Sequence, residues 1–242
     1  GIYMSSSDNA MLENLTVTGN TAEYGGGGIY MSSSDNVILE NLTVTGNTAS
    51  SNGGGLYLNE SDNAMLENLT VTDNTAEYGG GLYIYDSDNA MLENLTITDN
   101  TADWAGGMYL YNSDNAILNS LTITDNTAAS CGGGLYIYES DTPILSNLTV
   151  TDNSAASCGG GLYIYDSDTP ILSNLTVTGN TADINGGGIC LRRNSNNQML
   201  ENLTVTGNTA VSGGGIYLYD SDTVTVSNSI LWDNGSDPIY ND

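Results

Sequence analysis

The chain has 242 residues, and its 29 acidic side chains against two arginines give a formal net charge of −27. This balance argues against nucleic acid and against an anionic membrane surface as partners, because both are recognised through basic patches. No apolar run is long enough to cross a membrane, so we expect no membrane insertion.

Nine copies of one unit of 26 or 27 residues fill the sequence. The copies begin at Gly1, Gly28, Gly55, Gly81, Gly107, Gly134, Gly161, Gly188 and Gly215. A period in this range is typical of a solenoid, because one such repeat cannot bury its own apolar face and must stack on its neighbours. We therefore predict one elongated domain over residues 1–242.

The unit at 81–106 predicts three short strands. Residues 82–85, 90–93 and 95–98 each show a period of two, with DSDN turn chemistry after the first strand and a bend at Asn94. The frequent β-branched residues, Asn and Gly argue against helices. The predicted fold class is therefore all-β, a parallel β-helix of nine coils with three short strands per coil.

Stacked coils turn each position of the unit into a column. One column is the same residue in every unit, and a stack of asparagines at a turn lets each side-chain amide bond to the next. We predict an internal ladder formed by Asn20, Asn47, Asn74, Asn100, Asn126, Asn153, Asn180, Asn208 and Asn234.

Two short motifs carry a family resemblance. GGG-[IL], as at Gly132 to Leu135, and V-x-x-N, as at Val71 to Asn74, recur along the chain. They resemble the repeats of chlamydial-type polymorphic outer membrane proteins and related right-handed β-helix proteins of the pectin-lyase-like class. The resemblance covers all nine units. It implies a right-handed parallel β-helix that is extracellular or displayed at the cell surface, often as a passenger or an adhesive stalk.

Pairs of the form Thr-x-Thr recur in eight units, and both threonines are expected to point outward. With coils about 4.8 Å apart they would form a flat two-column grid, which resembles the ice-binding face of β-solenoid antifreeze proteins. The alternative is that threonine simply suits an outward strand position. The candidate ice-binding residues are Thr16, Thr18, Thr43, Thr45, Thr70, Thr72, Thr96, Thr98, Thr122, Thr124, Thr149, Thr151, Thr176, Thr178, Thr204 and Thr206.

Two tyrosine columns are predicted to form an outward aromatic face. Such rings can stiffen a sheet by stacking, or they can bind carbohydrate. The first column is Tyr3, Tyr30, Tyr57, Tyr83, Tyr109, Tyr136, Tyr163 and Tyr217, and the second is Tyr85, Tyr111, Tyr138, Tyr165 and Tyr219.

An apolar column is also predicted to point outward. Aligned apolar side chains on an exposed strand form a contiguous stripe, and such stripes mark interaction sites unless a loop covers them. We predict a lateral protein contact, with another copy of the chain as partner, through Met11, Ile38, Met65, Met91, Ile117, Ile144, Ile171 and Met199.

Acidic residues gather at one turn of the unit. Like charges at the coil spacing repel each other, and a hard cation with oxygen ligands would relieve this repulsion. The candidate Ca²⁺ ligands are the pairs Asp86 with Asp88 and Asp166 with Asp168. The alternative is a series of Asx turns with solvated carboxylates. No other cofactor is expected.

Cys131 and Cys158 occupy the same position in adjacent units, both within ASCGG. Adjacent coils place their Cα atoms about 4.8 Å apart, within the range of a disulfide, so we predict this bond and an oxidising compartment. Cys190 replaces a tyrosine in its column and is expected to be unpaired.

The pattern favours a structural or adhesive extracellular solenoid over an enzyme. Lysine and histidine are absent, no loop is long enough to wall a pocket, and any Asp cluster would repeat in nearly every coil. Neither end shows a strong cap, so exposed strand edges could template end-to-end stacking into filaments. The alternatives are an ice-binding protein that uses the threonine grid and a carbohydrate-binding stalk that uses the tyrosine columns.

Overall fold

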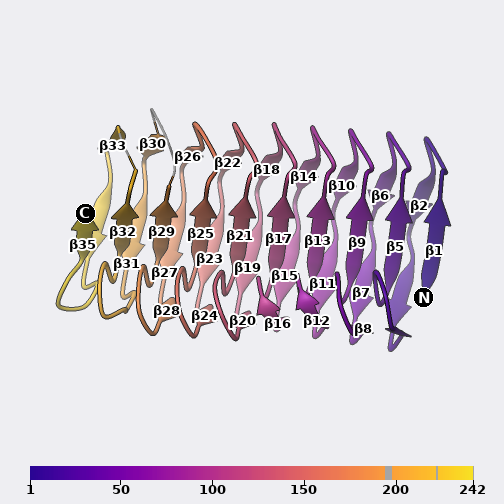
Figure 1. Cartoon of the computed structure of the whole chain (residues 1–242), viewed down its shortest axis with the longest axis horizontal. Coiled ribbons are helices and arrows are strands. Elements are labelled where there is room, and N and C mark those ends of the chain that lie inside the picture. The colour runs from indigo at the N-terminus through magenta and orange to yellow at the C-terminus, as the bar shows by residue number, and fades with distance from the viewer. Residues whose placement is uncertain (194–197, 222, 242) are drawn as a thin grey trace.

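A computed structural model describes residues 1–193, 198–221 and 223–241, and in it the chain winds into a rod of stacked coils. All of the paired strands are parallel, and they form four sheets that run along the rod. Figure 1 shows the strands of one sheet side by side over the whole length of the rod, with the two termini at its opposite ends. The described residues contain no helix. The all-β parallel solenoid is therefore confirmed.

Three of the sheets contain the strands that the sequence predicts. The first sheet consists of β1 (Ile2–Ser5), β5 (Ile29–Ser32), β9 (Leu56–Asn59), β13 (Leu82–Tyr85), β17 (Met108–Tyr111), β21 (Leu135–Tyr138), β25 (Leu162–Tyr165), β29 (Ile189–Arg192), β32 (Ile216–Tyr219) and β35 (Ile239–Asn241). The second consists of β2 (Met11–Glu13), β6 (Ile38–Glu40), β10 (Met65–Glu67), β14 (Met91–Glu93), β18 (Ile117–Asn119), β22 (Ile144–Ser146), β26 (Ile171–Ser173), β30 (Gln198–Glu201) and β33 (Val224–Ser227). The third consists of β3 (Thr16–Thr18), β7 (Thr43–Thr45), β11 (Thr70–Thr72), β15 (Thr96–Thr98), β19 (Thr122–Thr124), β23 (Thr149–Thr151), β27 (Thr176–Thr178), β31 (Thr204–Thr206) and β34 (Ile230–Trp232).

A fourth sheet was not predicted. It consists of β4 (Thr21–Ala22), β8 (Thr48–Ala49), β12 (Thr75–Tyr78), β16 (Thr101–Trp104), β20 (Thr127–Ala128), β24 (Ser154–Ala155) and β28 (Thr181–Ala182). These strands are mostly two residues long, which is too short for a period of two to be visible in the sequence. They follow the asparagine ladder and lead into the glycine-rich link to the first sheet of the next coil.

The register pairs equivalent positions of successive units. Leu82, for example, pairs with Leu56 on one side and with Met108 on the other. The inward columns form one continuous aliphatic core, in which Leu82, Leu92 and Ile97 are fully buried. Each coil has similar apolar residues at the same positions as its two neighbours. The inward side chains of one coil are therefore buried against those of the next.

The predicted asparagine ladder is present along the inner corner between the third and fourth sheets. The Nδ2 atom of each member donates to Oδ1 of the next, as from Asn74 to Asn100 at 3.0 Å. Gly55 and its equivalents pack directly against this ladder. A Cβ atom on Gly55 would lie 2.5 Å from the carbonyl oxygen of Gly81, which explains why the unit begins with glycine.

Candidate functional site

The Thr-x-Thr pairs lie on the third sheet with both side chains directed outward, as predicted. Equivalent threonines pair in register from coil to coil, as Thr70 does with Thr96. Several hydroxyls of the second column are engaged with the acidic residue that follows them. Thr124 Oγ1 donates to the Asp125 carboxylate at 3.1 Å, and Thr98 Oγ1 donates to Asp99 at 3.3 Å. These carboxylates fix hydroxyl directions along the edge of the grid.

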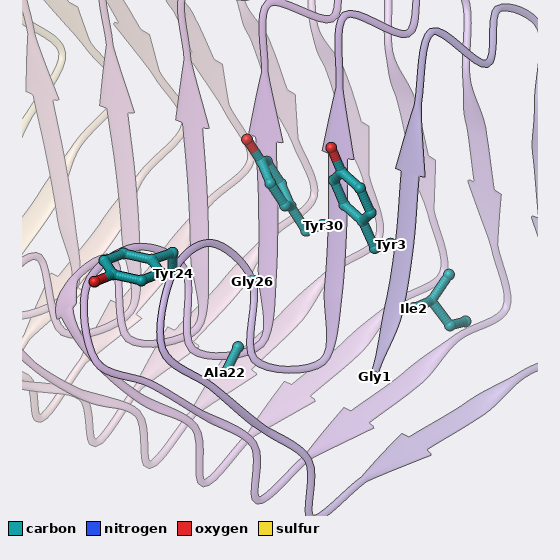
Figure 2. A pocket seen from close by; sticks show the side chains of 7 residues that line it. All are labelled: Gly1, Ile2, Tyr3, Ala22, Tyr24, Gly26 and Tyr30. Carbon is teal, nitrogen blue, oxygen red and sulfur yellow. The ribbon is translucent and has the colours of Figure 1, made fainter.

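The first tyrosine column points away from the main core, as predicted, but it is covered and does not form an exposed aromatic face, which corrects the prediction. Its central members are almost completely buried, with exposed fractions of 6% for Tyr83, 5% for Tyr136 and 4% for Tyr163. Tyr3, in the first coil, is 65% exposed. It lines a pocket of about 280 Å³ together with Tyr30 and the loop residue Tyr24, and Figure 2 shows the rings of Tyr3 and Tyr30 side by side on neighbouring strands.

A second core explains this burial. The residues that link the fourth sheet to the next first-sheet strand, here called the covering segments, fold over the column and pack on its rings. Trp104, at the end of β16 where one such segment begins, lies against Tyr136, with ring centroids 6.2 Å apart. Gly159 of another has a φ of +62°, and a Cβ atom there would lie 2.6 Å from Cβ of Tyr163. Glycine is therefore favoured where the segment crosses the column, although Ala105 occupies the equivalent position in one coil with a φ of +59°.

The second tyrosine column is half-buried and offers the accessible aromatic surface. Its rings stack at the coil spacing, as Tyr111 does on Tyr138 with centroids 4.9 Å apart. A hydrogen bond with Glu139, together with partial burial, raises the pKa of Tyr138 to about 12. Burial also raises the pKa of the first-column Tyr83 and Tyr136 well above the ordinary tyrosine value.

The predicted apolar stripe is exposed on the second sheet, and no described segment covers it. Ile117 and Ile144 are each 37% exposed, and Ile171 is 40% exposed. These three residues line a groove of about 520 Å³ with Met199, Asn115, Thr142 and Thr169.

The charge beside the stripe changes along the rod. The residue two positions after the stripe is acidic in the outer coils, namely Glu13, Glu40, Glu67, Glu93 and Glu201. In the three central coils it is Asn119, Ser146 and Ser173. Three of the four stripe residues that line the groove therefore have an uncharged residue in this flanking column, and the fourth, Met199, has Glu201. The sequence shows that these three neutral residues occupy the same position in successive units. It does not show that a groove lies beside them.

The acidic turn column forms a hydrogen-bonded ladder. The carboxylate of each aspartate accepts the backbone N–H of the next coil's aspartate, as Asp88 does from Asp114 at 2.8 Å. Asp86 accepts from the side chain of Asn112 at 2.9 Å. Grooves of about 430 and 400 Å³ are lined by Asp86 with Asp88 and by Asp166 with Asp168. Within the described residues no three acidic, cysteine or histidine side chains are grouped to hold a metal ion. Of the candidate Ca²⁺ ligands, Asp88 thus already serves the backbone and Asp86 a side chain, and cation binding stays a prediction.

A second ladder, of serines, was not predicted. The Oγ atom of each member accepts the backbone N–H of the preceding coil's serine, as between Ser61 and Ser87 at 2.9 Å. The buried members are Ser34, Ser61, Ser87, Ser113, Ser140 and Ser167. A serine recurs between two acidic residues in most units of the chain, and this recurrence is the signal that could have revealed the serine ladder.

One groove, here called the non-repeating groove, is lined by several side chains that do not recur in every unit. It has a volume of about 420 Å³ and is lined by Trp104, Ser130, Cys131, Tyr136, Tyr138, Ser157, Cys158, Tyr163, Tyr165 and Arg192. Cys131 and Cys158 pair through a parallel backbone bridge, so they are neighbours as predicted. All three cysteines have free, buried thiols in this structure, and the predicted disulfide is not formed in it. Cys190 lies in the tyrosine column between Tyr163 and Tyr217, as predicted.

The described residues contain no helix that is long and apolar enough to cross a membrane.

Two similar solved structures, both of one epimerase, share the fold at low identity. The periplasmic alginate epimerase AlgG has 13% identity and a TM-score of 0.51, over 89% of this chain and 46% of that chain. A mutant form of that epimerase has 12% identity and a TM-score of 0.59, over 99% of this chain and 70% of that chain. PfbA, a surface adhesin of Streptococcus pneumoniae, has 9% identity and a TM-score of 0.33, over 96% of this chain and 84% of that chain. At these identities the likeness concerns the fold alone.

A comparison with curated protein sequences finds no match. The family model described as "Right handed beta helix region" matches residues 1–171 and, in an overlapping second match, residues 118–241. Together the two matches cover nearly all of the nine units. The chain belongs to the right-handed β-helix family.

Proposed function

We propose that this protein is a non-enzymatic, extracellular structural or adhesive solenoid that associates laterally with further copies of itself. The observation that carries the proposal is the apolar groove at Ile117, Ile144 and Ile171, which lies where the flanking acidic column is interrupted. The resemblance to polymorphic outer membrane protein repeats supports display outside the cell.

A second copy suits this surface better than a charged partner does. Two copies related by a two-fold axis would place the same apolar patch of each chain against the other. The patch is flanked by Asn119, Ser146 and Ser173. In such a dimer the Glu column therefore places no carboxylates opposite each other at the centre of the contact. Elsewhere along the stripe, the Glu column would be opposed by its own copy and would repel it.

Two features limit the strength of this contact. A stable interface buries about 800 Å² on each partner, and a stripe one column wide offers less than a broad sheet face. The net charge of −27 also opposes the approach of two copies. We therefore expect association that depends on protein concentration and becomes stronger as added salt screens the charge.

Sedimentation velocity over a range of protein and salt concentrations tests the proposal. The wild-type chain should pass from monomer to dimer, whereas Ile144→Glu should remain monomeric because it places a charge at the centre of the contact. Thr149→Glu is the matched control, since it adds the same charge to the same coil but on the third sheet. A monomeric wild-type chain at every concentration, or equal association of Ile144→Glu, would overturn the proposal.

Ice binding is the second candidate, supported by the in-register threonine columns of the third sheet. The engagement of Thr98 and Thr124 with Asp99 and Asp125 counts against it, because these hydroxyls are already oriented by charged neighbours. Thermal hysteresis that is abolished by Thr72→Tyr and Thr98→Tyr, with the fold intact, would favour this function over the structural one.

Carbohydrate binding has a narrower basis than the sequence suggested. Burial removes most of the first tyrosine column, so the half-buried Tyr85, Tyr111, Tyr138, Tyr165 and Tyr219 would have to supply the aromatic surface. Binding on a glycan array that is lost in Tyr138→Ala would support this function.

A further inference from the structure

The three cysteines of the chain converge on one point, although they belong to different elements. Cys131 and Cys158 lie in adjacent covering segments, and Cys190 lies on β29 of the first sheet. Cys158 is paired with Cys131 by a parallel backbone bridge and with Asn185 on its other side, and it packs with Cys190 in the second core. Cys158 is therefore the central member of the cluster and contacts a partner in each direction.

The surroundings of Cys158 favour its thiolate over those of its neighbours. Besides the two thiols, the Ser157 hydroxyl lies 3.4 Å from its sulfur, and Nδ2 of Asn185 lies 3.8 Å from it. Hydrogen bonds from Cys131, Cys190 and these groups hold the pKa of Cys158 well below its usual range. Burial raises the pKa of Cys190, and the positive charge of Arg192 opposes this rise only in part.

The cluster is accessible from one side. Cys131 and Cys158 line the non-repeating groove of about 420 Å³, with exposed fractions of 6% and 4%, while Cys190 is fully buried behind them. Arg192, one of the two positive side chains of the chain, also lines this groove. A positive charge beside a thiol stabilises the thiolate and attracts an anionic thiol reagent.

We propose that Cys131, Cys158 and Cys190 form a redox-active thiol cluster, in which Cys158 is bonded to one neighbour at a time and the third thiol can displace that bond. The oxidant is a small disulfide such as oxidised glutathione.

The Cys158 thiolate attacks one sulfur of the oxidant, the S–S bond breaks, and one reduced glutathione leaves with a proton from the medium. The thiol of Cys131 or Cys190 then loses its proton and attacks the mixed disulfide at Cys158. The second glutathione leaves in its reduced form. In total, two protein thiols are oxidised to one disulfide, and one molecule of oxidised glutathione is reduced to two of glutathione.

The two alternative bonds have different structural effects. A bond between Cys131 and Cys158 links two adjacent covering segments. A bond between Cys158 and Cys190 ties a covering segment to the first sheet, across the second core. The position of the disulfide would therefore decide whether this covering segment is held to the sheet or only to its neighbour.

Peptide mapping under non-reducing conditions tests the proposal on the folded chain treated with oxidised glutathione. We expect one disulfide and one free thiol per chain, with the Cys131–Cys158 and Cys158–Cys190 bonds both present. Cys131→Ser and Cys190→Ser should each still close the remaining bond. Cys158→Ser should close none, because its two remaining thiols meet only through Cys158.

Serine is close to cysteine in size, so the variants should keep the packing. Thermal unfolding, monitored by circular dichroism, identifies the variants that remain folded. Two results would overturn the proposal. One is a Cys131–Cys190 bond formed in folded Cys158→Ser as fast as the bonds of the wild-type chain. The other is a folded wild-type chain that keeps three free thiols while the same chain unfolded in urea is oxidised.

Discussion

Asn126 and Asn153 are joined by two hydrogen bonds to one oxygen. The Oδ1 atom of Asn153 accepts from Nδ2 of Asn126 at 2.9 Å and from its backbone N–H at 3.0 Å. Nδ2 of Asn126 also donates to the carbonyl oxygens of Ile97 and Thr124. One buried side chain thus satisfies polar groups from three successive coils, where no water can replace it.

Asn126→Ala should destabilise the chain strongly. The substitution leaves the backbone N–H of Asn100 and the carbonyl oxygen of Ile97 without these partners, and an unsatisfied buried polar group costs about 1–3 kcal/mol. We expect a loss of about 3–5 kcal/mol in the free energy of unfolding, measured by urea denaturation. Thr122→Ala, on the exposed face of the same coil, should change it by no more than about 1 kcal/mol. An equal effect of both substitutions would refute an energetic role for the ladder.

The two tyrosine columns should differ in their contribution to stability. Tyr136 is 5% exposed in the second core, whereas Tyr138 on the same strand is half-buried. Tyr136→Ala removes a buried aromatic ring and should lower the free energy of unfolding by about 3–5 kcal/mol. Tyr138→Ala should cost clearly less. Chemical denaturation compares the two variants, and a larger loss for Tyr138→Ala would mean that the covering segments do not bury the first column.

Stability should fall at alkaline pH because of the same buried rings. Burial raises the folded-state pKa of Tyr83, Tyr109, Tyr136 and Tyr163 above the ordinary value of 10.0. Below pH 10 both states keep the phenol protons, so the contribution is complete. As the pH rises further, only the unfolded chain releases them, so each such tyrosine lowers the free energy of unfolding by up to about 1.4 kcal/mol per pH unit.

Near-ultraviolet absorbance of the phenolate measures this effect. The buried tyrosines should ionise together with unfolding, followed in parallel by far-ultraviolet circular dichroism. Complete ionisation of all sixteen tyrosines near pH 10 in a chain that remains folded would contradict their burial.

The aspartate ladder should tolerate loss of charge but not loss of its acceptor. The Asp114 carboxylate accepts the backbone N–H of Asp141 at 2.7 Å. Asp114→Asn keeps an acceptor and removes one of several aligned charges, so it should be neutral or stabilising at low salt. Asp114→Ala should destabilise the chain by about 1 kcal/mol. Thermal unfolding with and without Ca²⁺ completes this test, since a large stabilisation of the wild-type chain by Ca²⁺ alone would show a cation site at these turns.

The sequence was sufficient to predict the coils, their register and the asparagine ladder, because each depends on a pattern repeated nine times. It did not predict the fate of the first tyrosine column. Alternation along 82–85 assigns Tyr83 to the outer side of the sheet, which is correct, but burial there depends on how the covering segment folds back. The positive-φ position of Gly159 recurs from unit to unit, but side chains that pack on the rings, such as Trp104, do not, so no column pattern shows that the rings are covered.

The non-repeating groove escaped prediction for a related reason. Cys131 and Cys158 are recognisable as neighbours because they share a position in adjacent units. Cys190 lies on the first sheet, whereas Cys158 lies in a covering segment, so only the packing of the covering segments on the first sheet brings the two together. A column pattern predicts neighbours within one sheet, but it does not predict contacts between sheets.

Small-angle X-ray scattering against protein concentration tests the central claim most directly, because it separates the width of a rod from its length. Lateral association through Ile117, Ile144 and Ile171 predicts that the cross-sectional radius of gyration increases with concentration while the maximum dimension changes little. Ile144→Glu should keep the cross-section of a single rod at every concentration. A maximum dimension that multiplies at constant cross-section would show end-to-end stacking instead, and this result would contradict the lateral contact.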